Sequence, residues 1–185
     1  NSFKGQVPRF DKNVSLTAID IQSNSFQSPL STLSANTELV EFNSTGNNNI
    51  EGRIPELNFC TKLVKFNIQS NDHTGPIHNF HNTPLLEEYM AFDNSLSGNL
   101  PAISAAPNLT KLDLNGNEFV GNIPYLNDNV KLTLLNLQNN GLSGSFPLVT
   151  SLSALEFLRF QNNSKSSSPT IIGDVPIVSG CPLLN

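Results

Sequence analysis

The sequence predicts a solenoid: a right-handed coil of about eight 23-residue repeats, with a parallel sheet on its concave side and an irregular convex side. The first observation is the period. Asparagine recurs every 23 residues with one step of 24, at Asn1, Asn24, Asn47, Asn71, Asn94, Asn117, Asn140 and Asn163. The second is a fixed pattern of leucines before each asparagine, such as Leu109, Leu112 and Leu114 before Asn117. Repeats of this length stack into coils that bury their apolar faces against one another.

Each repeat is expected to open with a short strand. Leu112 and Leu114 alternate with the polar Asp113, which is the pattern of a strand with one buried face. Strands stacked about 4.8 Å apart would form the concave sheet. The complete strand segments begin at Leu16, Leu39, Leu63, Leu86, Leu109, Leu132 and Leu155.

The recurrent asparagine has a structural explanation. The chain turns after each strand and leaves backbone N–H and C=O groups inside the coil, where an inward Asn can donate to some and accept from others. We therefore expect a ladder of stacked Asn side chains. A glycine four residues later suits a backbone conformation that a side chain would obstruct. Two repeats depart from the pattern, because Ser28 takes the glycine position and an extra residue precedes Gly52.

A second apolar row is predicted on the convex side, two residues after the position that proline usually fills. Its members are Phe10, Leu33, Leu57, Phe80, Ile103, Leu126, Val149 and Val178. The segments around them are too short and too rich in Pro, Asn and Ser for α-helices, so we expect turns, short extended pieces and an occasional 3₁₀ turn. The insertion between Asn163 and Gly173 has the composition of a surface loop, either a tolerated one or one that contacts ligand or carries O-glycans.

Composition restricts the function. The net charge of -5 and the pI near 5.0 argue against nucleic acid or an anionic membrane as partner, because both attract basic patches. No apolar run approaches the roughly 20 residues of a membrane span. No nucleophile elbow, phosphate loop or paired-carboxylate motif is present, so we expect neither an enzyme nor a cofactor. Residues 1–185 are expected to form a single solenoid that starts and ends inside a repeat of a longer chain.

The cysteines and histidines do not suggest a disulfide or a metal site. Cys60 and Cys181 occupy equivalent positions five coils apart, about 24 Å at the strand spacing, which is too far for a disulfide. They are core residues, or Cys181 pairs with a cysteine beyond residue 185. His73, His78 and His81 do not converge as zinc ligands must, and His73 holds a position that is apolar in other repeats.

Side chains that point out of the concave sheet form the candidate binding surface. Most are amides and hydroxyls, but Met90 with Phe92, and Leu134 with Phe157, form apolar spots typical of binding hot spots. Isolated exposed apolar groups are also common on surfaces without function. The predicted ligand contacts are Met90, Phe92, Asp113, Asn115, Leu134, Asn136, Gln138, Phe157 and Arg159.

Four N-glycosylation sequons occur, at Asn13, Asn43, Asn108 and Asn162. They carry glycans only if the chain is secreted. Asn43 is the informative one, because it falls in the central outward column of the concave sheet. A glycan there would displace ligand binding toward the C-terminal coils.

Two segments carry a resemblance to a known family. Asn94-Ser-Leu-Ser-Gly-Asn-Leu-Pro101 and Asn140-Gly-Leu-Ser-Gly-Ser-Phe-Pro147 resemble the plant-type leucine-rich repeat. That repeat occurs in receptor-kinase ectodomains and polygalacturonase-inhibiting proteins. The resemblance implies a secreted or cell-surface recognition role in which the concave face binds the ligand.

These observations together predict an extracellular or cell-surface, N-glycosylated, non-catalytic module for recognition or adhesion, with a protein or a glycan as ligand. The alternative is a structural glycoprotein that assembles end to end into fibres with copies of itself. It rests on the absence of capping motifs at either end of the sequence, since open solenoid ends expose a coil's worth of core.

Overall fold

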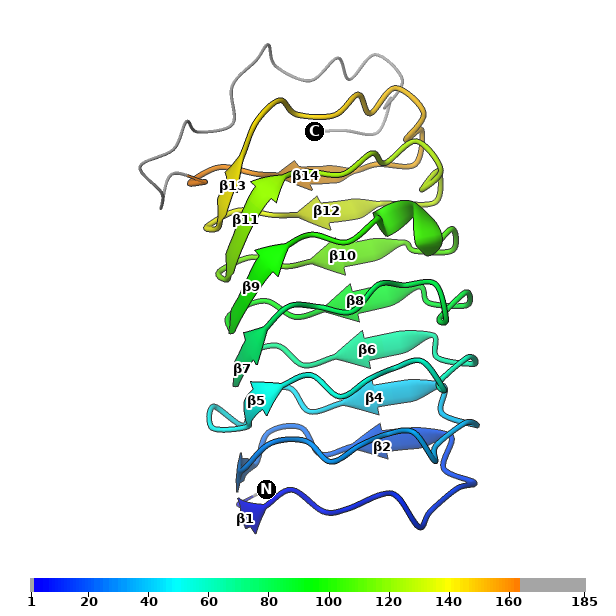
Figure 1. Cartoon of the computed structure of the whole chain (residues 1–185), viewed down its shortest axis with the longest axis vertical. Coiled ribbons are helices and arrows are strands. Elements are labelled where there is room, and N and C mark those ends of the chain that lie inside the picture. The colour runs from blue at the N-terminus through cyan, green and yellow to red at the C-terminus, as the bar shows by residue number, and fades with distance from the viewer. Residues whose placement is uncertain (1, 164–185) are drawn as a thin grey trace.

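The structure, a computed structural model, describes residues 2–163, which wind into a continuous coil of about seven turns (Figure 1). One strand from each turn enters a seven-stranded parallel sheet, stacked in sequence order. This is the sheet predicted for the concave side, and the predicted solenoid is confirmed. Its strands are β2 (Ala18–Asp20), β4 (Glu41–Asn43), β6 (Lys65–Asn67), β8 (Glu88–Met90), β10 (Lys111–Asp113), β12 (Leu134–Asn136) and β14 (Phe157–Arg159).

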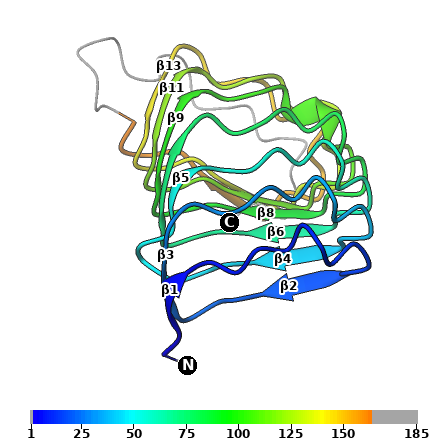
Figure 2. The ribbon, with the colours of Figure 1, turned by 60° about the horizontal axis from the view of Figure 1, so that its bottom comes forward.

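A second row of parallel strands follows the first at the next side of each coil (Figure 2). The sequence pattern predicted only short extended pieces here. Consecutive segments pair because alternate residues point into the coil and bury apolar groups such as Phe26, Leu96 and Phe119. The strands are β1 (Lys4–Gln6), which pairs with β3 (Ser25–Gln27), and β5 (Glu51–Arg53), β7 (Asp72–Gly75), β9 (Ser95–Asn99), β11 (Glu118–Asn122) and β13 (Gly141–Ser143), which form a five-stranded sheet.

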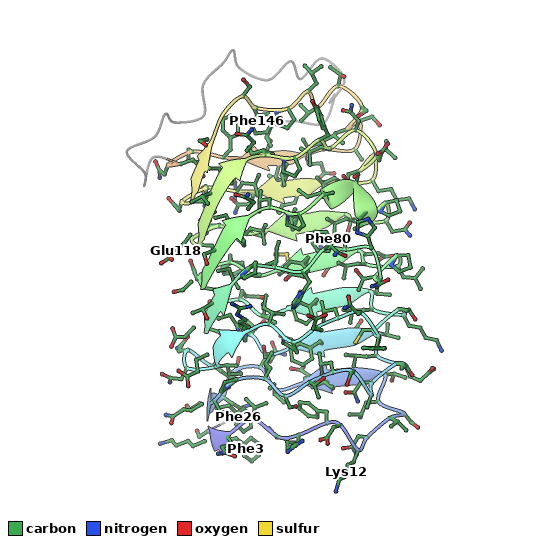
Figure 3. The ribbon with its side chains drawn as sticks, in the orientation of Figure 1. Phe3, Lys12, Phe26, Phe80, Glu118 and Phe146 are labelled. Atoms are coloured by element: carbon green, nitrogen blue, oxygen red, sulfur yellow. The ribbon has the colours of Figure 1, made fainter. Side chains whose placement is uncertain are left out.

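The core is a column of inward side chains that runs through all the described coils. Aromatic rings fill its middle: Phe42 stacks on Phe66 at 5.3 Å between ring centroids, and Tyr89 follows at 5.4 Å. Phe80 reaches across from the convex side and meets Tyr89 edge-on at 5.4 Å (Figure 3). The predicted convex row is buried from Leu33 to Val149 and partly buried at Phe10, whereas Val178 lies outside the described residues.

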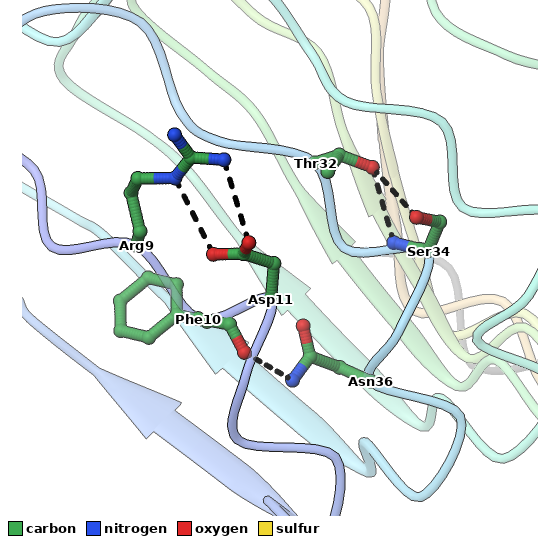
Figure 4. Close-up of polar contacts among 6 residues, drawn as sticks. All are labelled: Arg9, Phe10, Asp11, Thr32, Ser34 and Asn36. Atoms are coloured by element: carbon green, nitrogen blue, oxygen red, sulfur yellow. Dashed lines mark hydrogen bonds and ion pairs between the residues drawn. The ribbon is translucent and has the colours of Figure 1, made fainter.

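The convex side has no α-helix within residues 2–163, as predicted, and its one 3₁₀ turn is η1 (Ile103–Ala105). Two buried asparagines on this side form hydrogen bonds between coils that the sequence pattern did not predict. Asn36 Nδ2 donates to the carbonyl of Phe10 in the preceding coil at 3.2 Å (Figure 4), and Asn129 Nδ2 donates to that of Ile103 at 3.1 Å. They satisfy backbone carbonyls that the turns leave inside the coil.

The predicted asparagine ladder is present. Asn117 Nδ2 donates to the carbonyls of Ala91 in the preceding coil and Leu114 in its own coil, at 2.9 and 3.0 Å. Its Oδ1 accepts the Leu96 N–H at 3.0 Å. Each rung therefore joins two coils through both ends of one amide. The same two-sided pattern recurs at Asn47, Asn94, Asn140 and Asn163.

The irregular repeat breaks one rung of this ladder. Asn71 Nδ2 still donates to the carbonyls of Ser44 and Ile68, but its buried Oδ1 has no partner among the described residues. The extra residue in the preceding coil, where Asn48 has a φ of 60°, interrupts the regular spacing at this point. At the other departure, Ser28 adopts a φ of 101° in the glycine position, and its Oγ accepts the Val7 N–H at 3.2 Å.

The residue before each ladder asparagine is left-handed in every described coil. These residues have φ between 52° and 66°, and all are small or can hydrogen-bond locally, which is the requirement for that conformation. The tight bend turns each ladder side chain inward. The residues are Ser23, Gly46, Ser70, Asp93, Gly116, Asn139 and Asn162.

His73 is a buried member of the core, as its position in the repeat predicted. The backbone N–H of His73 donates to Asn94 Oδ1 at 3.0 Å, and its imidazole Nδ1 lies 3.4 Å from the Gly52 carbonyl oxygen. Its Nε2 is buried without a partner in the described part of the chain. Burial lowers the pKa of the imidazole to about 4, against smaller opposing effects of the Gly52 carbonyl and Asp72.

Cys60 is a buried free thiol in the core, in agreement with one of the two predictions for the cysteines. Its Sγ lies 3.7 Å from the Leu33 carbonyl oxygen, and burial raises its pKa to about 11. Thiolate chemistry is therefore suppressed at this position. Cys181 and the insertion after Asn163 lie outside the described residues.

The ladder is expected to contribute directly to stability. The change Asn117→Ala leaves the Ala91 and Leu114 carbonyls and the Leu96 N–H without this partner. We expect the free energy of unfolding to fall by about 1–3 kcal/mol, the usual cost of unpaired buried polar groups. Denaturant melts measure the change. Asn127→Ala on the exposed convex turn is the control, and a loss of only a few tenths of a kcal/mol at Asn117 would contradict the role.

His73 is expected to make stability fall in acid. Its folded pKa of about 4 lies below the ordinary value of 6.5, so the unfolded chain binds more protons between these two pH values. Stability from this group is complete above pH 6.5 and is lost as the pH falls toward 4, by up to about 3 kcal/mol.

The control is His73→Leu, which places at this position the residue found at Leu96. Denaturant melts across this pH range should show a steeper loss for the unmodified chain than for the variant. Parallel pH profiles for the two proteins would show that His73 does not titrate in this way.

Candidate ligand-binding face

The outward side chains of the seven-stranded sheet form one face, which we call the sheet face. Strand alternation positions them, because each buried central residue of a strand is flanked by two residues that point outward. Register is strict along the stack, so equivalent residues of successive coils lie side by side. The central column consists of Asp20, Asn43, Asn67, Met90, Asp113, Asn136 and Arg159.

Most of the charge on this face is neutralised in pairs. Lys65 Nζ lies 3.1 Å from Glu41 Oε1, and Lys111 Nζ lies 2.8 Å from Glu88 Oε1, each between neighbouring strands. Arg159, in contrast, forms no ion pair within residues 2–163. The C-terminal end of the described face therefore carries an exposed, unpaired cation.

Asp113 and Asn136, two of the predicted ligand contacts, point outward but are covered by their neighbours. Asp113 Oδ2 accepts from Asn136 Nδ2 at 3.0 Å, and Oδ1 accepts the Asn115 N–H at 3.0 Å. Burial raises the pKa of the Asp113 carboxyl, and these two hydrogen bonds oppose that shift. Strands about 4.8 Å apart crowd the central column, which alternation alone does not reveal. Asp113 and Asn136 are therefore bonded to each other and largely covered, so we expect them to hold the strands in place rather than to contact a ligand.

An apolar spot lies beside the unpaired cation. Leu134 and Phe157 are direct neighbours in register, and Phe157 is 45% exposed. The Arg159 guanidinium carbon lies 5.8 Å from the centre of the Phe157 ring, within the range of a cation–π interaction. The structure thus brings together three of the predicted contacts.

The second predicted spot lies two strands away. Met90 is half-buried between Asn67 and Asp113 in the central column, and Phe92 follows it in the adjacent column, also half-buried. Strand β10, with Asp113, separates this spot from Leu134. The face therefore has two apolar areas with a polar strip between them.

A chain of amides borders the C-terminal half of the sheet face. Asn139 Nδ2 donates to Asn115 Oδ1 at 2.8 Å, and Asn162 Nδ2 donates to Asn139 Oδ1 at 3.0 Å. Gln161 donates to Gln138 in the neighbouring column. Asn139 and Gln161 were not among the predicted contacts. Asn139 could have been found from the recurrent small polar residue before each ladder asparagine.

The four sequon asparagines lie on different parts of the molecule. Asn43 is half-buried in the central column of the sheet face, and Asn13 is exposed on the convex side. Asn108 is held on both sides of its amide: Nδ2 donates to the Pro84 carbonyl at 2.8 Å, and Oδ1 accepts from Lys131 at 2.7 Å. Asn162 is exposed at the edge of the sheet face.

Within residues 2–163, no group of three or more His, Cys, Asp or Glu side chains is arranged to hold a metal ion. His78 is instead used structurally, since its Nε2 lies 3.0 Å from the Ile54 carbonyl oxygen. None of the helices described is long and apolar enough to span a membrane.

Comparison with known proteins adds the family. A family model for the leucine-rich repeat matches residues 108–129 and 131–151. A search of curated proteins by sequence found no match. Among solved structures, a TDR receptor is 30% identical with a TM-score of 0.81, over 86% of this chain and 29% of its own.

Two further receptors are similar. The plant peptide hormone receptor RGFR1, solved with RGF2, is 30% identical with a TM-score of 0.78, over 88% of this chain and 27% of its own. The Arabidopsis receptor kinase HAESA, solved with the peptide hormone IDA and the co-receptor SERK1, is 25% identical with a TM-score of 0.88, over 100% of this chain and 31% of its own.

The chain spans between about a quarter and a third of the length of these receptors. Within this chain the repeat period, the parallel strand order and the Asn-x-Leu-Ser-Gly segments all recur. The chain belongs to the leucine-rich-repeat family, and its repeats are of the plant type.

Proposed function

We propose that the chain is an extracellular, non-catalytic recognition module whose sheet face binds a protein ligand. The observation that carries the proposal is the cluster of Leu134, Phe157 and Arg159, which is partly exposed, apolar and positively charged. The similar receptors support it, since two of them were solved with RGF2 and with the peptide hormone IDA.

The cluster has the chemistry of an interface hot spot. Aromatic and arginine side chains dominate such sites when the groups around them exclude water. The Phe157 ring is held beside Leu134 in a hydrogen-bonded sheet, so its ordering costs little when a ligand binds. Arg159 forms no ion pair within residues 2–163, although its charge favours the ionised form of the Asp113 carboxyl. It is exposed and can bind a carboxylate or a carbonyl of the ligand.

The bordering amides suit the backbone of an extended ligand. Asn139 Nδ2 is fixed on Asn115 Oδ1, and Gln138 and Gln161 form a second pair. Side-chain amides both donate and accept, as peptide groups do. They serve a glycan as well, so a glycan ligand and a role in adhesion remain within the same proposal. The hydrophobic Leu134–Phe157 contact favours protein.

Glycans are proposed at Asn43 and Asn108, and also at Asn13 and Asn162. A glycan on Asn43 would cover the N-terminal part of the sheet face and leave β8 to β14 for the ligand. Mass spectrometry of protein from secreting cells would locate occupied sites. Four bare sites would contradict both the glycoprotein and the displacement of the ligand.

The ligand site is tested with peptides selected from a random displayed library against the chain. We expect the selected peptides to bind at least about tenfold more weakly to Phe157→Ala and to Arg159→Ala, a loss of about 1.4 kcal/mol or more, because aromatic and arginine side chains dominate hot spots. Titration calorimetry measures the affinities.

The matched control is Phe59→Ala. Phe59 is 54% exposed on a turn before Cys60, away from the sheet face, so its removal tests general stickiness of exposed phenylalanine. Peptides that bind all three variants as tightly as the unmodified chain would contradict the proposed face. Peptides that lose affinity only with Phe59→Ala would place the site elsewhere.

A second candidate function is end-to-end assembly. A hollow of about 550 Å³ opens beside the first described coil, lined in part by Phe3, Ile21 and Phe26. Its apolar walls would accommodate another coil, from the same protein or from a second copy. If copies stack there, sedimentation should show association that grows with concentration and that Phe3→Asp abolishes. A monomer at all concentrations would remove this candidate.

A further inference from the structure

A groove lies on the flank of the solenoid, away from the sheet face. Two successive coils form it, through the segments 122–125 and 145–148 that follow β11 and β13. Its volume is about 520 Å³. Phe146, labelled in Figure 3, packs against Phe160 with 4.7 Å between ring centroids and a tilt of 42° between the rings, which fixes one wall. The other principal lining residues are Asn122, Pro124, Tyr125, Pro147 and Leu148.

The groove departs from the rest of the repeat. Tyr125 and Leu148 occupy one outward position in consecutive coils, and they are 81% and 58% exposed. In the preceding described coils this position is polar or small: Arg9, Thr32, Glu56, Asn79 and Ala102. The fold itself therefore does not require a large apolar side chain here. Two in succession indicate a surface that contacts something else.

None of the described residues that line the groove is charged. Its polar side-chain groups are the Asn122 amide and the hydroxyls of Ser145 and Tyr125. Asn122 and Ser145 are exposed, as Tyr125 is. An ionic ligand would find no opposite charge among these described residues. A neutral ligand could hydrogen-bond to the amide and hydroxyl groups and place its apolar faces against the apolar side chains.

We propose that this groove binds a neutral, extended polysaccharide. Sugar rings present flat C–H faces between hydroxyl-bearing edges, and an exposed tyrosine offers the complementary combination of an apolar ring and a polar tip. Tyr125 would stack one sugar, and Leu148 with Phe146 would contact the next. The amide of Asn122 and the hydroxyl of Ser145 would hydrogen-bond their edges.

The repeat supports an extended ligand. Tyr125 and Leu148 hold equivalent positions in consecutive coils and line the same groove, so one extended chain can contact both.

A protein partner fits less well. A stable protein interface needs about 800 Å² from each partner. The large apolar side chains cover only two of the described coils at this position, and on the N-terminal side the surface returns to Ala102 and Asn79. The groove is suited to a narrow ligand.

The test uses the whole chain and neutral β-linked hexasaccharides of glucose, mannose and xylose. Titration calorimetry or saturation-transfer NMR should detect binding of at least one of them, and none for an oligogalacturonate of the same length. Tyr125→Ala should weaken binding about tenfold or more, whereas Tyr125→Phe should keep most of it because the ring remains.

Leu148→Ala should also weaken binding, and Leu85→Ala is its matched control. Leu85 is 48% exposed but is not a lining residue of the groove. Circular dichroism checks that each variant is folded, which these exposed positions should permit. The result is independent of the sheet face, since selected peptides should bind Tyr125→Ala normally.

Three results would overturn the proposal. The first is no binding of any neutral hexasaccharide at millimolar concentration. The second is binding that Tyr125→Ala and Leu148→Ala leave unchanged. The third is self-association of the unmodified chain in sedimentation that Tyr125→Ala abolishes, because the groove would then seat a second copy.

Discussion

The whole structure depends on the asparagine in the turn that follows each strand of the seven-stranded sheet. A solenoid must turn its backbone inside each coil, where water cannot satisfy the N–H and C=O groups. One amide at Asn117 solves this for two coils at once, since it donates to the Ala91 and Leu114 carbonyls and accepts the Leu96 N–H. Where an extra residue enters before Asn71, one acceptor is left without a described partner, yet the sheet continues in register. The ladder therefore tolerates one fault because its other rungs hold the neighbouring coils.

This constraint also determines which surfaces are free to vary. Inward positions must fill the core, and the residue before each ladder asparagine must be able to adopt a left-handed φ. The outward positions are not restricted in this way, so their side chains can differ between coils. On the sheet face this freedom yields Leu134, Phe157 and Arg159, and on the flank it yields Tyr125 and Leu148. Both sites are recognised as departures from the chain's own repeat.

The balance of charge separates the two surfaces. On the sheet face, Lys65 and Lys111 form ion pairs with glutamates of neighbouring strands. Arg159 is in none of the ion pairs of residues 2–163 and lies against the Phe157 ring. The flank groove, as far as residues 2–163 line it, has no charged side chain. A ligand with a carboxylate or a peptide backbone suits the first, and an uncharged sugar chain suits the second.

The sequence alone determined the solenoid, its period, the strand positions, the ladder and the direction of each side chain, because all of these follow from periodicity. It also placed His73 in the core, from the apolar residues at equivalent positions. Only the tertiary structure decided the second sheet and the accessibility of outward residues. Asp113 and Asn136 point outward as predicted, but crowding between strands covers them and joins them by a hydrogen bond. The contact of Phe157 with Arg159 and the groove at Tyr125 likewise depend on packing between coils, which a one-dimensional pattern does not specify.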